Sequence, residues 1–211
     1  MLLTVVDYGV GNLRSIAKSI EKANSENNLS YSIKISSDIN DIKKADKLVL
    51  PGQGSFKACK EGINNIDGLH NELNESVLNK KKPIFGICAG MQLFASIGHE
   101  ETKTEGLNWI SGEVVKLKMS SENLKIPHMG WNEIKIKNTS PVFKNLTNND
   151  HVYFIHSYEF TPKDKSVISL TTDYGKNIVA AVSFRNIFGA QFHPEKSQRT
   201  GIGILSNFLK I

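Results

Sequence analysis

The chain has 211 residues, 39% of them apolar and 22% charged, with a formal net charge of +5 and a pI near 9.1. These values are typical of a water-soluble protein with one buried core, and no apolar run reaches the roughly 18 residues that a membrane-spanning helix needs. The basic residues are dispersed, with Lys80, Lys81 and Lys82 as the one tight run, which argues against nucleic-acid binding. We therefore expect one domain over residues 1–211.

The two cysteines, Cys59 and Cys88, are too few for a disulfide framework or a four-cysteine zinc site, which favours a reducing compartment. Residues 1–8 are mainly apolar and no basic segment precedes them, so we expect a first strand there and not a signal peptide. Both features predict a cytoplasmic protein.

The first half of the chain alternates between short apolar runs and segments with helical periodicity. Leu13, Ile16, Ala17 and Ile20 recur at helical spacing, and a second helical region, residues 58–78, is interrupted near Gly68. The expected strands are 2–7, 31–35, 47–50 and 83–87. Helical segments between consecutive strands imply crossover connections, so the sheet should be mostly parallel.

The second half is rich in short strands separated by polar turns, and it ends in a helix with Ile202, Leu205, Phe208 and Leu209 on one face. Asn186 is expected at the tip of a hairpin between Phe184 and Ile187, a usual place for a residue that tolerates positive φ. The expected strands are 114–117, 132–136, 152–155, 167–170, 179–184 and 187–192. The predicted fold class is α/β, with a mostly parallel central sheet flanked by helices and an added antiparallel β region.

The sequence Gly86-Ile87-Cys88-Ala89-Gly90 follows a predicted buried strand and precedes a predicted helix over 91–97, as in a nucleophile elbow. Glycines two positions either side of the cysteine allow such a strained turn to close. Free N–H groups at a helix start favour the thiolate form of the side chain. Cys88 is the candidate nucleophile; the alternative is a small buried cysteine at a strand end.

His193 and Glu195 end the predicted strand 187–192 and are two residues apart, so they can face the same site on an extended segment. A thiolate that performs acyl transfer needs a proton donor for the leaving group, and that donor needs an orienting group. We therefore assign these roles to His193 and Glu195.

A glycine-rich turn, residues 51–55, follows a strand expected to lie near the elbow. The Gly52–Gln53 peptide N–H and the Ala89 N–H could together bind the oxyanion of a tetrahedral intermediate. The alternatives are a phosphate-binding loop and a plain turn.

With these residues in this order, the chain resembles the class I, triad-type glutamine amidotransferases, and more narrowly it looks like the glutaminase subunits of imidazole glycerol phosphate synthase. The likeness extends over nearly the whole chain, and residues 127–132 are its most specific part. The blocks that carry it are Asp7–Leu13, Pro51–Phe56, Gly86–Gln92, Pro127–Asn132, His156–Tyr158 and Gln191–Ser197.

The resemblance implies a class I glutamine amidotransferase-like fold and glutamine hydrolysis through a Cys88-His193-Glu195 triad, with Gln92 holding the glutamine. It also implies a heterodimer with a (β/α)₈ cyclase subunit, which uses the ammonia to form imidazole glycerol phosphate and an aminoimidazole carboxamide ribotide in histidine biosynthesis. It implies no metal or organic cofactor. The residues expected toward the partner are Asn12, Trp131, Tyr153, Tyr158 and Lys196.

Two positions depart from the usual family pattern: Gln53 stands where valine is common, and Ala89 where leucine is common. Neither change removes a catalytic atom, because the proposed donors there belong to the backbone. The departures leave open a paralogue that supplies ammonia for sugar amination in surface-glycan synthesis. More distant alternatives are a cysteine hydrolase that acts alone on peptides or γ-glutamyl compounds, and a catalytically idle scaffold.

Overall fold

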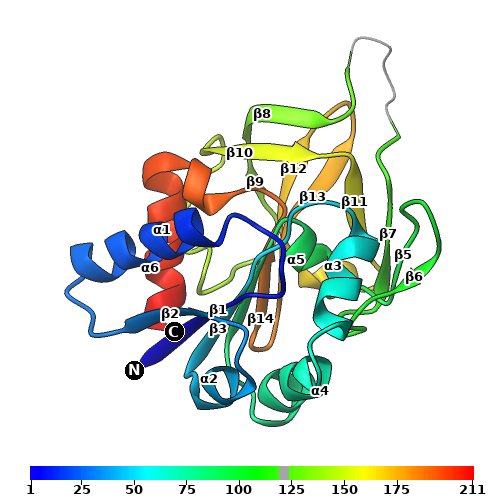
Figure 1. Ribbon diagram of the computed structural model, residues 1–211. Coiled ribbons are helices and arrows are strands. Elements are labelled where there is room, and N and C mark those ends of the chain that lie inside the picture. The colour runs from blue at the N-terminus through cyan, green and yellow to red at the C-terminus, as the bar shows by residue number, and fades with distance from the viewer. Residues whose placement is uncertain (119–123) are drawn as a thin grey trace.

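An eight-stranded mixed sheet forms the centre of the computed structural model, which describes residues 1–118 and 124–211 (Figure 1). Five strands at one side pair in parallel, and the remaining three pair antiparallel with their neighbours. In spatial order they are β2 (Ser32–Ser36), β1 (Leu2–Val6), β3 (Lys47–Leu50), β4 (Ile84–Ile87), β14 (Ile187–Ala190), β13 (Asn177–Phe184), β12 (Ile168–Asp173) and β9 (Lys135–Ile136). The α/β prediction is confirmed.

Helices cover both faces of this sheet. Leu48 and Leu50 of β3 point into one apolar cluster while Val49 points into the other, because successive side chains of a strand alternate between faces. Helices α1 (Leu13–Glu26) and α6 (Gln198–Lys210) lie side by side over one face (Figure 1). The other face is covered by α2 (Ile39–Lys44), α3 (Phe56–Asn64), α4 (Leu69–Asn74), the π-helical η1 (Glu75–Asn79) and α5 (Ala89–Gln92).

Two smaller β structures complete the fold. An antiparallel ribbon pairs β8 (His128–Glu133) with β10 (His151–His156). A four-stranded sheet has the order β11 (Tyr158–Pro162), β7 (Gly112–Lys116), β5 (Ile97–Gly98) and β6 (Thr104–Glu105). The 3₁₀ turns are η2 (Lys165–Val167) and η3 (Pro194–Lys196). Within the described residues, no helix is long and apolar enough to cross a bilayer.

The helix predicted over 91–97 is wrong in its extent, because α5 ends at Gln92 and Ile97 lies in β5. The carbonyl oxygens of Leu93, Phe94 and Ala95 accept hydrogen bonds from backbone N–H groups of residues 107–110 instead of continuing a helix. Helix α2 was not predicted: it has one turn of apolar spacing, and the Asp38 side chain caps it by accepting from the Asn40 N–H at 2.8 Å.

The hairpin tip predicted at Asn186 is confirmed, since Phe184 pairs with Ile187, and the residue of the tip with a positive φ is Arg185, with φ 57°. Asn186 connects the hairpin to residues 77–82, because its amide donates to the carbonyl oxygens of Val77 and Lys82, both at 2.9 Å.

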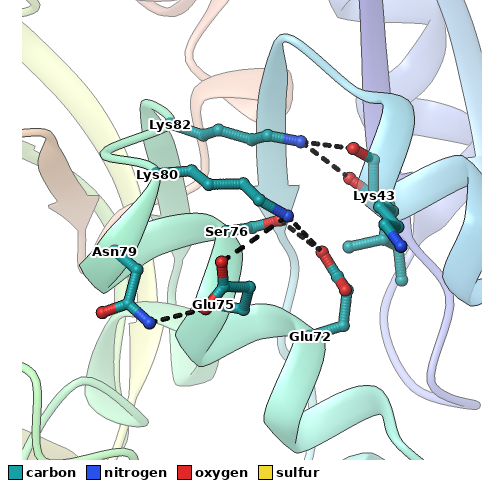
Figure 2. Close-up of polar contacts among 8 residues, drawn as sticks. Lys43, Glu72, Glu75, Ser76, Asn79, Lys80 and Lys82 are labelled. Carbon is teal, nitrogen blue, oxygen red and sulfur yellow. Dashed lines mark hydrogen bonds and ion pairs between the residues drawn. The ribbon is translucent and has the colours of Figure 1, made fainter.

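Figure 2 shows the polar contacts that Lys80 and Lys82, two residues of the lysine run, make with neighbouring helices. Lys82 donates to the carbonyl of Lys43 at 2.7 Å, at the end of α2, and Lys80 lies beside Glu72 and Glu75.

Candidate active site

Cys88 occupies the sharp turn between β4 and α5, with φ 54° and ψ −115°. Such a conformation costs a side-chain-bearing residue about 1–3 kcal/mol, so the surrounding structure must impose it. The backbone N–H of Cys88 donates to the carbonyl of Ala190 on β14 at 2.8 Å. A β-carbon on Gly86 would lie 2.5 Å from the Phe94 ring, and one on Gly90 would lie 2.0 Å from the Leu50 oxygen. Both glycines are therefore required for the turn to close.

His193 and Glu195 lie on the chain just after β14, at the same edge of the sheet. The His193 Nδ1 atom is 2.8 Å from Glu195 Oε1, and the carboxylate side chain is only 1% exposed. Cys88 also lies near the imidazole, because both its hydrogen bonding and its charge raise the pKa of His193. The backbone N–H of His193 donates to Tyr153 of β10 at 2.9 Å. The structure thus brings together the three residues predicted to form the triad.

The His193 ring is held in its protonated form. Burial lowers its pKa, but hydrogen bonds with Cys88 and Glu195 and the negative charges of these two groups outweigh burial and raise the pKa to about 9. The ring is therefore an imidazolium at neutral pH. Beside the Cys88 sulfur, it is a proton donor ready for a leaving group.

The glycine-rich turn after β3 packs directly against the elbow. A β-carbon on Gly52 would lie 2.1 Å from the Gly90 nitrogen. Two buried donors fix the carbonyls on either side of the Gly52–Gln53 peptide: the Tyr8 hydroxyl donates to Pro51, and the Cys59 thiol donates to Gln53 with an Sγ–O distance of 3.6 Å.

Burial raises the pKa of Cys59 to about 11, so this second thiol stays protonated and remains a donor. The peptide that the sequence suggested for oxyanion binding is therefore flanked by two anchored carbonyls.

A pocket of about 210 Å³ opens over Cys88. Every residue predicted for catalysis or substrate binding lines it: Gly52, Gln53, Cys88, Ala89, Gln92, His193 and Glu195. Three residues predicted to face a partner, Asn12, Tyr158 and Lys196, line it as well. The pocket also includes Gly54, Glu100, Ile155, His156 and Ser157, which were not predicted as site residues.

The other two residues predicted to face a partner, Trp131 and Tyr153, lie outside this pocket on the β8–β10 ribbon. They are directly opposite in the register, with ring centroids 6.0 Å apart, and Lys196 lies 5.7 Å over the Tyr153 ring. Trp131 is 46% exposed and Met129 57% exposed on the same face of β8. An exposed apolar patch with an aromatic centre is typical of a protein interface.

Gln191 was not singled out from the sequence. Its amide donates to the Cys88 sulfur at 3.6 Å, and its oxygen accepts from Gln92 at 2.9 Å. A signal was present: Gln191 is a polar residue in the predicted apolar strand 187–192, two residues before His193, and alternation along a strand would place the two side chains on one face.

The arrangement suits acyl transfer from an amide or ester. It combines a nucleophilic sulfur and a proton donor beside it, next to a glycine-rich turn and a helix start. In the ranges 1–118 and 124–211, no group of three or more His, Cys, Asp or Glu side chains could hold a metal ion.

Comparison with known proteins gives a consistent family. The model of the family "Glutamine amidotransferase class-I" matches residues 4–211. The chain is 51% identical to the imidazole glycerol phosphate synthase subunit HisH of Pelagibacter ubique, covering 100% of both chains. It is 43% identical to the subunit of the same name from Brucella suis, covering 100% of this chain and 99% of that one.

Solved structures share the fold at low sequence identity. A crystal structure described as a glutamine amidotransferase matches with a TM-score of 0.70 and 14% identity, covering 99% of each chain. A glutamine amidotransferase from Thermotoga maritima matches with a TM-score of 0.61 and 17% identity, covering 92% of this chain and 76% of that one.

The pKa of His193 provides a direct test of the charge arrangement. Replacing Cys88 by alanine removes a hydrogen bond and a negative charge, so the pKa of His193 should fall below about 9, and Glu195→Gln should act in the same direction. NMR titration of the imidazole Cε1 proton measures this. Cys59→Ser, which changes the other thiol, should leave the His193 titration unchanged.

The raised pKa of His193 also makes the free energy of unfolding depend on pH. The pKa of His193 is raised above its ordinary value of 6.5, so the stabilisation is fully present below about pH 6.5 and is lost as the pH rises through about 9. A His193 titration that is the same in the parent chain and in Cys88→Ala would show that Cys88 does not raise the pKa of His193.

Proposed function

The chain belongs to the class I glutamine amidotransferases, and we propose that it is the glutaminase subunit of an imidazole glycerol phosphate synthase, acting in histidine biosynthesis. We assign one amidotransferase domain to residues 1–211. The observation that carries the catalytic part is the contact of Cys88 with His193, and of His193 with Glu195, at the base of one pocket.

In this proposal, the Cys88 thiolate attacks the side-chain amide carbon of glutamine. His193 gives its proton to the amide nitrogen as the C–N bond breaks, so ammonia leaves and a glutamyl thioester remains. The neutral His193 then takes a proton from water as the water attacks the thioester, and glutamate and the thiolate are released. Glu195 orients the imidazole and stabilises its charged form.

Backbone donors would stabilise the oxyanion formed in each attack. Ala89 supplies the first N–H of α5, which has no partner within the helix. The Gly52–Gln53 peptide supplies the second donor when its N–H faces the sulfur. The anchored carbonyls of Pro51 and Gln53 support a rotation of this one peptide, by which a partner could switch the activity.

Gln92 would orient the glutamine substrate. Its amide group already donates to Gln191 at 2.9 Å and to the Tyr158 carbonyl at 3.0 Å. With both amide protons engaged, only the side-chain oxygen of Gln92 remains for substrate, and an oxygen accepts hydrogen bonds. This favours a contact with a donor group of glutamine.

The partner in this proposal is a (β/α)₈ cyclase that receives the ammonia, in a cytoplasmic heterodimer. The synthase-subunit names of the relatives imply a partner subunit, and the apolar outer face of the β8–β10 ribbon supports its docking place. That face adjoins the pocket, because Ile155, on the same face of β10 as Tyr153, lines the pocket. Ammonia released at Cys88 would then have a short path into the partner.

The relatives do not favour the sugar-amination alternative, since they are named as synthase subunits over their full length. The departures at Gln53 and Ala89 fit the same conclusion. Gln53 has an exposed side chain, and at both positions the proposed donor is a backbone N–H that any residue other than proline supplies. The intact contacts around Cys88 disfavour a catalytically idle scaffold.

The proposed function is tested by glutamate release from glutamine, measured for the chain alone and with the cyclase of its own organism plus that cyclase's nucleotide substrate. The complex should be strongly activated, and Cys88→Ala should reduce its rate by about 10⁴-fold or more. Retained glutamine hydrolysis in the Cys88→Ala complex would show that another group is the nucleophile. Hydrolysis of peptides without any partner would favour the lone hydrolase.

The backbone origin of the oxyanion donors predicts opposite results for neighbouring substitutions. Gly52→Ala would push the turn off the elbow and should lower kcat of the complex by roughly 10²–10³-fold, whereas Gln53→Ala should stay within about fivefold of the parent. Steady-state kinetics of the two complexes measures this. A larger loss in Gln53→Ala than in Gly52→Ala would assign the donor to a side chain.

The docking face predicts a selective loss of partner affinity. Trp131→Ala should raise the Kd for the cyclase about 30-fold, because exposed aromatic residues at the centre of an interface supply much of the binding energy. Leu78→Ala, which removes an exposed apolar side chain on η1, is the matched control and should bind normally. Isothermal titration calorimetry measures both; equal affinities would place the partner elsewhere.

A further inference from the structure

The inner face of the β8–β10 ribbon carries two buried histidines that the proposed reaction does not use. His128 and His156 are 2% and 6% exposed and lie opposite each other in the register. Nδ1 of His128 is 3.0 Å from Nε2 of His156, and Nδ1 of His156 is 2.8 Å from the carbonyl oxygen of Tyr158. Burial lowers the pKa of His128 to about 4 and that of His156 to about 3, so both rings are neutral at pH 7.

The contacts determine which nitrogen of each ring carries its proton. A carbonyl oxygen only accepts, so the proton of His156 must be on Nδ1, and its Nε2 is then an acceptor. The proton of His128 must therefore also be on Nδ1. Its Nε2 accepts from the amide of Asn132 at 3.2 Å, and that amide also donates to the carbonyl of Asp173 at 2.8 Å. Every donor in this set has an acceptor.

The same Tyr158 carbonyl links the histidines to the nucleophile. It accepts a second hydrogen bond from Gln92, at 3.0 Å, and Gln92 also donates to Gln191, whose own amide donates to the Cys88 sulfur. Because the Tyr158 oxygen accepts from both sides, no proton can pass along this path. The chain of contacts can orient groups, but it cannot transfer a proton.

We propose that His128 and His156 are positioning residues for Cys88, acting through the Tyr158 carbonyl, Gln92 and the Gln191 amide that donates to the sulfur. Only the identity of Cys88 as the nucleophile rests on the proposed function. Asn132, at the far end of this set, is adjacent on β8 to Trp131 of the exposed face. A displacement of the ribbon at that face would therefore change the position of the Gln191 amide that donates to the Cys88 sulfur.

A purely structural role is the competing explanation, since the His128 ring stacks on Phe154 and Tyr174, with centroids 4.6 and 4.0 Å away. The two roles differ in what they predict for Cys88. Packing alone affects the stability of the fold, whereas positioning affects the reactivity of the sulfur in a chain that remains folded.

The test is the rate of Cys88 alkylation by iodoacetamide against pH, followed by mass spectrometry on the full chain without a partner. Gln191→Leu and His156→Leu should slow alkylation at pH 7 by roughly 10-fold and move the profile to higher pH, while His156→Asn should recover to within about threefold of the parent. The asparagine amide replaces the Nδ1–H donor to Tyr158. Tyr174→Phe keeps the stacking and should react as the parent does.

Unchanged alkylation profiles in folded Gln191→Leu and His156→Leu would overturn the proposal. Should these variants fail to fold, ¹⁵N NMR of the unaltered chain decides. Both histidines should show the neutral Nδ1–H tautomer at pH 7, and a charged ring or an Nε2–H tautomer at either position overturns the inference. Neither readout requires glutamine hydrolysis, so the outcome is independent of the glutaminase test.

Discussion

The contact between two backbone turns, one after β3 and one after β4, is the constraint on which the rest of the site depends. Gly52 and Gly90 approach so closely that neither position has room for a β-carbon. The contact arises because β3 and β4 are parallel neighbours, so their carboxyl ends meet at one edge of the sheet. It places the Gly52–Gln53 peptide beside the strained Cys88 turn, and β14, the next strand along, delivers His193 to the same edge.

Burial and specific hydrogen-bond partners determine which histidines of the site are charged. His193 and His156 are both buried, yet the pKa of His193 is raised while that of His156 is lowered. The difference comes from the neighbours, because His193 faces a sulfur and a carboxylate whereas His156 faces a carbonyl and another neutral ring. One environment thus favours an acid for proton transfer and the other a fixed, uncharged donor.

Much of this could be predicted from the sequence, because local patterns carry it. The apolar runs predicted most strands of the central sheet, and the Gly86–Gly90 spacing predicted the elbow. The proximity of His193 and Glu195 was also predicted, but the extended segment assumed for it is wrong, because Glu195 lies in the 3₁₀ turn η3. What could not be predicted depends on distant partners. Helix α5 is short because residues 107–110 take the carbonyls that would extend it, and the pairing of His128 with His156 depends on the register of the ribbon.

The two cysteines of the chain, Cys59 and Cys88, differ in their expected reactivity toward oxidants and electrophiles. Cys59 is buried, bonded to the Gln53 carbonyl and held as a thiol by a pKa near 11, and thiols react with oxidants and electrophiles far more slowly than thiolates do. Cys88 sits at the base of an open pocket beside an imidazolium. Oxidants would therefore modify Cys88 before Cys59. Modification of Cys88 would abolish turnover directly, while the buried Cys59 thiol would remain unmodified.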